Sequence, residues 1–175
     1  MQYIDINDIN MGNWKIYSKG KISKNKTIYY DNDRFMKIWH KDFIWKKNFM
    51  NALNKNFYDE ISILISVITC DGDIIGYITK KVNDSKLIHD GRVIKDTENA
   101  KDVFYQSFLE KVCNKFDSTG LIHIDLTYPN IGILNNNYYI FDLESVVDIT
   151  EIDQHMKCLS LCPLKYQKYI INKFH

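Results

Sequence analysis

The chain lacks a hydrophobic run long enough to span a membrane, and it lacks a recognisable secretory signal. Its first ten residues, MQYIDINDIN, carry acidic side chains where the apolar core of a signal would lie. The 23 basic and 22 acidic residues leave a net charge of +1, so no overall field favours nucleic acid or an anionic membrane. We therefore expect an intracellular, cytoplasmic protein without a membrane partner, and we do not expect a nucleic-acid partner.

Cysteine is also scarce, and its spacing gives no clear metal-binding pattern. Cys70 and Cys113 stand far apart, whereas Cys158 and Cys162 are four residues apart, with His155 nearby. A zinc site would need a second closely spaced pair of ligands, so the simpler interpretation is that Cys158 and Cys162 share one helical face. The scattered thiols favour a reducing environment.

The composition is that of a folded protein. Hydrophobic residues make up 45% of the chain and charged residues 26%, which is typical of a globular domain and not of a disordered segment. A length of 175 residues is sufficient for a substantial core. We expect one domain, or two small lobes that share a cleft.

The most informative stretch runs from residue 120 to residue 148, GLIHIDLTYPNIGILNNNYYIFDLESVVD. Ile131 to Leu134 can form a strand, and Tyr138 to Phe141 can form its return strand. Asn135 to Asn137 can connect them, because asparagine tolerates positive φ. The pattern predicts a β-hairpin that ends in acidic residues.

This hairpin has a chemical consequence. Asp125 and Asn130 precede its first strand and Asp142 follows its second, so antiparallel pairing would bring all three to the same end. Carboxylate and amide oxygens are suitable ligands for Mg²⁺ held mainly through a substrate's phosphates. One carboxylate could instead accept a proton from an attacking hydroxyl.

The same stretch resembles a known family. Residues 123–130, HIDLTYPN, look like the catalytic loop of the protein-kinase-like superfamily, with H-x-D and an asparagine five residues after the aspartate. Residues 141–144, FDLE, look like the metal-binding segment that follows. Protein kinases usually have D-F-G there, and this D-x-E is closer to aminoglycoside phosphotransferases and choline kinases. A solvated hairpin would leave the H-x-D-x4-N spacing unexplained.

The resemblance implies an α+β, two-lobed protein-kinase-like fold. It places a five-stranded antiparallel sheet plus one helix in an N-lobe of residues 1–80, and a reduced, mainly helical C-lobe in residues 81–175. The chain has no A-P-E motif and no room for a protein kinase's activation segment and helical subdomain. It therefore resembles a minimal member of the superfamily, comparable to the smallest atypical protein kinases.

Local patterns give the elements that this fold requires. The strands that we expect in the N-lobe are residues 14–17, 27–30, 34–39, 61–69 and 74–79, the last two joined at Asp71-Gly72. Four-residue apolar spacing predicts a helix over residues 41–58. The helices that we expect in the second half are residues 100–116, broken by Gly120, residues 150–161 before Pro163, and a final helix that includes residues 166–174.

For the second half of the chain, the resemblance implies a set of site residues. Asp125 would orient or deprotonate an acceptor hydroxyl, while Asn130 and Asp142 would hold Mg²⁺ on the phosphates of ATP. Glu144 would assist a second metal or cap the following segment. His123 is expected to pack and form hydrogen bonds that shape the loop, and not to carry protons.

For the first half, the resemblance implies that Lys37 contacts the nucleotide phosphates and that Gly20 lies in the loop covering them. Two departures stand out. Gly20 is the only glycine of that loop, so the Gly-rich signature is missing. The predicted helix carries Lys46 and Lys47 where the family would have a glutamate to pair with Lys37. The identity of any acid that pairs with Lys37 stays open.

The function implied is an ATP- and Mg²⁺-dependent phosphotransferase that transfers a γ-phosphate to a hydroxyl of a protein or a small molecule. The two departures favour a first alternative, a pseudokinase that acts as a binding or regulatory module. A second alternative is a metal-dependent phosphodiesterase or nuclease that uses Asp125, Asp142 and Glu144. The acceptor and the oligomeric state are not readable from the sequence.

Overall fold

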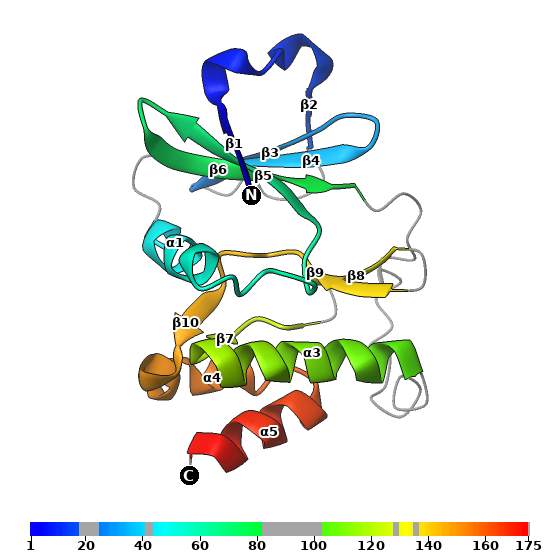
Figure 1. Ribbon diagram of the computed structural model, residues 1–175, viewed down its shortest axis with the longest axis vertical. Helices are drawn as coiled ribbons and strands as arrows, with labels where there is room; N and C mark the ends of the chain where they lie inside the picture. Colours follow the sequence, from blue (N-terminus) through cyan, green and yellow to red (C-terminus); the bar gives the residue numbers. More distant parts are fainter. Residues whose placement is uncertain (18–24, 41–43, 82–102, 128–129, 135–136, 175) are drawn as a thin grey trace. The chain divides into compact units, whose positions relative to one another are not determined.

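The computed structural model describes residues 1–17, 25–40, 44–81, 103–127, 130–134 and 137–174. It has a mixed α+β architecture with a six-stranded sheet and, among the described residues, four α-helices (Figure 1). The chain divides into two compact units. The first comprises Met1–Lys46 and Ile63–Asn83, and the second comprises Lys47–Ser62 and Asp84–His175. No helix within the described residues is long and apolar enough to cross a bilayer.

The first unit is built on the six-stranded sheet. Its strands are β1 (Gln2–Asp5), β2 (Lys15–Ile16), β3 (Lys26–Tyr30), β4 (Arg34–Trp39), β5 (Leu64–Cys70) and β6 (Asp73–Lys80), in the order β1-β5-β6-β4-β3-β2. The pairs are antiparallel except β1 and β5, which run parallel. The expected sheet of five antiparallel strands is therefore wrong by one strand. β1 was missed because its partner lies about sixty residues away, with Tyr3 opposite Val67.

The hairpin predicted at Asp71 and Gly72 is confirmed, and it connects β5 to β6. Cys70 pairs with Asp73, which leaves a two-residue loop of Asp71 and Gly72. Their φ angles are 51° and 82°. Positive φ at both central residues is the requirement of a type I′ turn, whose twist matches that of the flanking strands.

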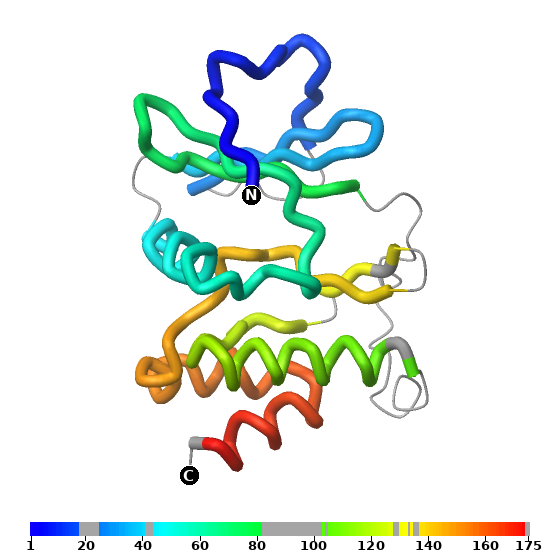
Figure 2. The backbone as a smooth tube through the Cα atoms, viewed as in Figure 1, coloured from blue at the N-terminus to red at the C-terminus, as the bar shows by residue number. Residues whose placement is uncertain are grey.

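The N-terminal segment supplies part of the core of the first unit. Met36, Ile68 and Ile78 are buried in the sheet, and Ile4, Ile6, Ile9 and Trp14 are among the side chains that pack against them. Two short 3₁₀ turns, Ile6–Asp8 and Met11–Asn13, carry the chain over the sheet between β1 and β2 (Figure 2). The sequence does not predict that this segment contributes to the core, because its apolar side chains lie among polar residues and follow no regular period.

The second unit combines helices with two small antiparallel ribbons. Its elements are α1 (Lys46–Asn54), α3 (Val103–Thr119), β7 (Leu121–His123), β8 (Ile131–Leu134), β9 (Asn137–Ile140), β10 (Val146–Asp148), a 3₁₀ helix (Ile149–His155), α4 (Met156–Leu159) and α5 (Leu164–Phe174). β7 pairs with β10, and β8 pairs with β9. The helix expected over residues 41–58 is shorter than predicted, and residues 41–43 lie outside the described part.

Helix α3 is the central packing element of this unit. The Tyr105 and Phe108 rings lie 5.2 and 6.1 Å from the ring of Tyr138 in β9, measured between centroids. Phe116 lies 6.2 Å from Tyr169 of α5. The helix runs to Thr119, three residues beyond its predicted end, and the predicted break at Gly120 is confirmed: Gly120 adopts a φ of 68° and its N–H donates to the Phe116 carbonyl. Figure 1 shows α3 with the β8–β9 hairpin on one side and α5 on the other.

A substitution at Gly76 in β6 can test how closely β6 approaches β4. A Cβ atom added to it would lie 2.1 Å from the Lys37 carbonyl oxygen of β4, a contact that only backbone movement can relieve. We expect Gly76→Ala to reduce the free energy of unfolding by about 1–3 kcal/mol, measured by urea denaturation. The control is Gly72→Asn, where the turn is open and asparagine tolerates the left-handed backbone. Equal stability of the two variants would contradict the close approach of β4 and β6.

Candidate functional site

The β8–β9 hairpin forms with the predicted strands, displaced by one residue in the second strand. Ile131 pairs with Ile140 and Leu134 with Asn137, so Asn130 stands at the open end of the hairpin. The Phe141 N–H donates to the Asn130 carbonyl oxygen at 2.8 Å. The residue before β8 and the residues after β9 are thus held together, as expected. Asn135 and Asn136 of the predicted turn lie outside the described residues.

Asp125 is half-buried and accepts hydrogen bonds on both carboxylate oxygens. The Thr127 hydroxyl donates to Oδ1 at 3.1 Å, and the Asn130 amide nitrogen donates to Oδ2 at 2.8 Å. These two donors fix the plane of the carboxylate. Both donors are neutral groups, so neither brings a positive charge to the carboxylate.

The hydrogen bonds of Asn130 define which way its amide faces. Its nitrogen donates to the Asp125 main-chain carbonyl at 2.9 Å and to the Asp125 carboxylate at 2.8 Å. Both partners are acceptors only, so the nitrogen must face them. The amide oxygen, which is the branch that can bind a cation, therefore faces away from Asp125.

Asp142 begins a tight turn that leads into β10. The Ser145 N–H donates to the Asp142 carbonyl oxygen at 3.0 Å, and the Ser145 hydroxyl donates to Asp142 Oδ2 at 2.8 Å. The Ser145 carbonyl accepts from the N–H of Ile124 at 2.9 Å. The Asp142 turn is therefore bonded to the residue that immediately precedes Asp125.

His123 is fully buried at the point where these segments meet. Its Nε2 lies 3.0 Å from the Asp142 carbonyl oxygen, which can only accept, so Nε2 carries the proton. Nδ1 has no hydrogen-bond partner in the described part of the chain. Burial lowers the pKa of His123, although the nearby carboxylates of Asp142, Asp125 and Glu144 act to raise it. The ring is thus neutral and serves as a hydrogen-bond donor, and the three carboxylates are its neighbours.

Two residues that the sequence did not single out as site residues hold the strand that precedes Asp125. The Tyr166 hydroxyl of α5 accepts from the His123 N–H at 3.0 Å, and Tyr166 is fully buried. The Cys162 thiol lies 3.5 Å from the Ile124 carbonyl oxygen. Burial raises the pKa of Cys162 to about 12, so it stays protonated and can donate. From the sequence, Tyr166 is predicted only to lie on the apolar face of the final helix.

Glu144 differs from the two aspartates in its exposure. Only 2% of its surface is accessible. Its neighbour Leu143 accepts a hydrogen bond from the hydroxyl of Tyr58, which lies in the segment that follows α1. Burial raises the pKa of Tyr58 well above its usual range, and the charges of Glu144 and Asp142 add to this. The role of Glu144 as a metal ligand stays a prediction.

Lys37 and Gly20 complete the predicted set. Lys37 lies in β4 of the first unit, between Ile28 of β3 and Tyr77 of β6, and its Nζ is 5.2 Å from the centre of the Tyr77 ring. Gly20 lies outside the described residues. The roles of both in binding phosphates stay predictions.

The donor set fits a divalent cation that is shared with phosphates. Asn130 and Asp142 offer an amide oxygen and a carboxylate at one end of a hairpin, which is a typical protein contribution to a magnesium site completed by phosphates and water. The described residues contain no group of three or more His, Cys, Asp or Glu side chains that could hold a metal ion. Cys158 and Cys162 accordingly form no such group.

The buried His123 makes stability depend on pH. Its pKa is lowered in the folded state from an ordinary value of 6.5, so the unfolded chain binds the proton more readily. The resulting stabilisation is complete above about pH 6.5 and is lost as the pH falls, by up to about 1.4 kcal/mol per pH unit. We expect the wild type to lose about 1 kcal/mol more than His123→Gln between pH 7.5 and pH 5.5, measured by urea denaturation.

The matched control for this measurement is His40→Gln, because His40 is an exposed histidine of the first unit. That variant should keep the wild-type pH dependence. If His123→Gln also kept it, a neutral buried His123 would be wrong.

No protein-family model matches the chain, and no curated protein matches its sequence.

Proposed function

We propose that the chain is a phosphotransferase that uses ATP and Mg²⁺, in which Asp125 accepts the proton of an acceptor hydroxyl. The observation that carries the proposal is the hydrogen-bonded unit of Asp125 and Asn130. One amide orients the carboxylate and at the same time turns its own oxygen outward. A base and a cation ligand are thereby fixed relative to each other, which phosphoryl transfer requires because it depends on positioning and charge stabilisation.

The residues have separate tasks in this scheme. Asp125, held by Thr127 and Asn130, would orient the hydroxyl and take its proton. Asn130 and Asp142 would hold the cation through their oxygens. A bound Mg²⁺ would bridge phosphate oxygens and neutralise the charge that develops on them. His123 stays neutral and maintains the position of the Asp142 main chain.

A catalytically inactive binding module is the second candidate, and one observation favours it. Helix α1, Lys46–Asn54, contains no acidic residue. The resemblance would place there the glutamate that pairs with Lys37. An intact Asp125–Asn130 unit beside a helix α1 that lacks this glutamate is compatible with a protein that binds nucleotide and does not transfer phosphate.

Asp125→Asn tests the proposal. The amide keeps an acceptor for Asn130 but cannot accept a proton, so phosphate transfer should fall by about 10²–10⁴-fold. Nucleotide binding should change little. Transfer is measured with ATP labelled at the γ-phosphate and Mg²⁺, using the protein itself and a panel of hydroxyl compounds as acceptors. Binding is measured by the thermal shift with ATP.

The control is Asp153→Asn, an exposed aspartate in the 3₁₀ helix of the second unit. It should retain wild-type transfer. If Asp125→Asn also retained transfer, Asp125 would not be the base. A wild type that binds ATP and transfers nothing would favour the binding module.

A further inference from the structure

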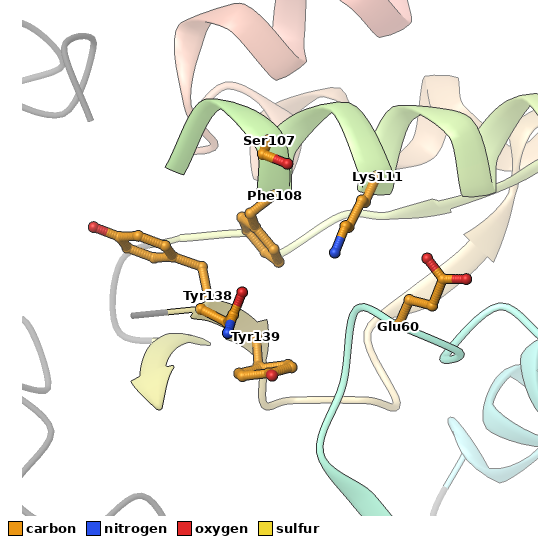
Figure 3. A pocket seen from close by; sticks show the side chains of 7 residues that line it. Glu60, Ser107, Phe108, Lys111, Tyr138 and Tyr139 are labelled. Atoms are coloured by element: carbon orange, nitrogen blue, oxygen red, sulfur yellow. The ribbon is translucent and has the colours of Figure 1, made fainter. Parts of the chain in front are cut away.

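A small cavity lies within the second unit, between α3, β9 and the segment that follows α1. Its volume is about 50 Å³, which is room for roughly three to five water-sized groups. The buried rings of Phe108 and Tyr138, 6.1 Å apart between centroids, form the apolar part of its wall. The polar part of its wall includes the side chains of Glu60, Ser107, Lys111 and Tyr139 (Figure 3).

The segment that carries Glu60 is fixed on both sides of that residue. Before it, the Lys115 ammonium group of α3 donates to the Asn56 carbonyl oxygen at 3.1 Å. After it, the Ile61 carbonyl oxygen accepts from the Ile140 N–H, at the end of β9, at 2.8 Å. The walls of the cavity are therefore joined to one another by hydrogen bonds on both sides of Glu60.

Lys111 and Glu60 bring opposite charges to this cavity. Both side chains are exposed, and they point into the same space (Figure 3). Within the described part of the chain, neither side chain forms a hydrogen bond or an ion pair. Glu60 also has a φ of 67°, in the left-handed region that residues with a Cβ atom rarely adopt, and such strain often occurs at ligand-binding positions. An ammonium group and a carboxylate are thus both available to a ligand.

These two charges determine which class of ligand the cavity can take. A simple anion would be attracted by Lys111 but repelled by Glu60, and a simple cation would experience the reverse. A molecule that carries one charge of each sign would be attracted by both residues. The hydroxyls of Ser107 and Tyr139 can donate to a carboxylate or accept from an ammonium group. The volume limits such a zwitterion to a few non-hydrogen atoms, since drug-sized ligands occupy pockets of about 300–1,000 Å³.

We propose that this cavity binds a small free amino acid such as glycine, with the carboxylate of the ligand on Lys111 and its ammonium group on Glu60. The Phe108 and Tyr138 rings would contact the carbon that joins the two charged groups. This inference does not depend on the proposed function, because the lining residues that carry it are not those of the phosphotransferase site.

The test is a titration of the full chain with glycine, followed by two-dimensional ¹H–¹⁵N NMR. Acetate and methylammonium, each of which carries one of the two charges, are titrated in parallel. Glycine should give saturable shifts at the amides of residues 107–111 and 137–139. It should bind about fivefold more tightly than either single ion, because it forms a second ion pair at the protein surface.

Two variants remove one charge each. Glu60→Asn removes the carboxylate, and asparagine tolerates the left-handed backbone at this position, so glycine should bind about fivefold more weakly and no better than acetate. In Lys111→Gln, glycine should bind no better than methylammonium. A variant that failed to fold would instead bind none of the three compounds. The matched control is Lys168→Gln, an exposed lysine of α5, which should bind all three as the wild type does.

The outcomes separate this inference from the proposed function. Glycine that gives no saturable shift, or that binds the wild type no more tightly than acetate does, overturns the amino-acid site. Retention of the wild-type glycine affinity in Glu60→Asn or Lys111→Gln also overturns it. Neither result bears on the phosphotransferase, which is tested by transfer from ATP, and a failed transfer assay would leave glycine binding unaffected.

Discussion

The candidate site depends on the hydrogen bonds that join residues 123–124 to residues 142–145. The His123 ring donates to the Asp142 carbonyl, and the Ile124 N–H donates to the Ser145 carbonyl. These bonds continue the pairing of β7 with β10, where Val146 stands opposite His123. Asp125 and Asp142 are distant in sequence, and this ladder is what keeps their segments adjacent. Without it, the proposed base and the proposed metal ligand, which lie on separate loops, would have no defined spacing.

The burial of His123 determines the charge state of its ring and therefore how the ring bonds between these two segments. A buried imidazolium would lose its hydration, and the surrounding carboxylates of Asp142, Asp125 and Glu144 compensate only in part, so the neutral form prevails. A neutral ring with its proton on Nε2 can bond to one carbonyl oxygen in one orientation. Because the folded state favours neutral His123, the stability of the fold decreases as the pH falls below the ordinary pKa of histidine.

Residues near the C-terminus support the short strand that leads to Asp125. Tyr166 accepts the His123 N–H and Cys162 contacts the Ile124 carbonyl, so main-chain groups of two consecutive residues have partners on one short stretch of chain. Both side chains are buried, where a peptide group without a partner costs about 1–3 kcal/mol. α5 thus contributes to the geometry around Asp125 although it carries none of the proposed chemistry.

The sequence by itself determined the local elements whose signals lie within a few residues. Arg34–Trp39 forms the predicted strand, Asp71 and Gly72 form the predicted turn, and β8 pairs with β9 as predicted, with the second strand displaced by one residue. That pairing brings Asn130 beside Phe141, the residue before Asp142, and Asp125 is joined to Asn130 by hydrogen bonds.

Only the tertiary structure decided the rest. The parallel pairing of β1 with β5, the bond between Tyr166 and His123, and the contact of Ser145 with Asp142 leave no mark in local periodicity. β1 and Tyr166 meet partners that are tens of residues away, and the Ser145 hydroxyl finds Asp142 because the backbone turn is held by Ile124. Local patterns reflect which face of an element is apolar. Which buried polar group finds which partner depends on how separate elements pack, since satisfying those groups is a condition on the whole fold.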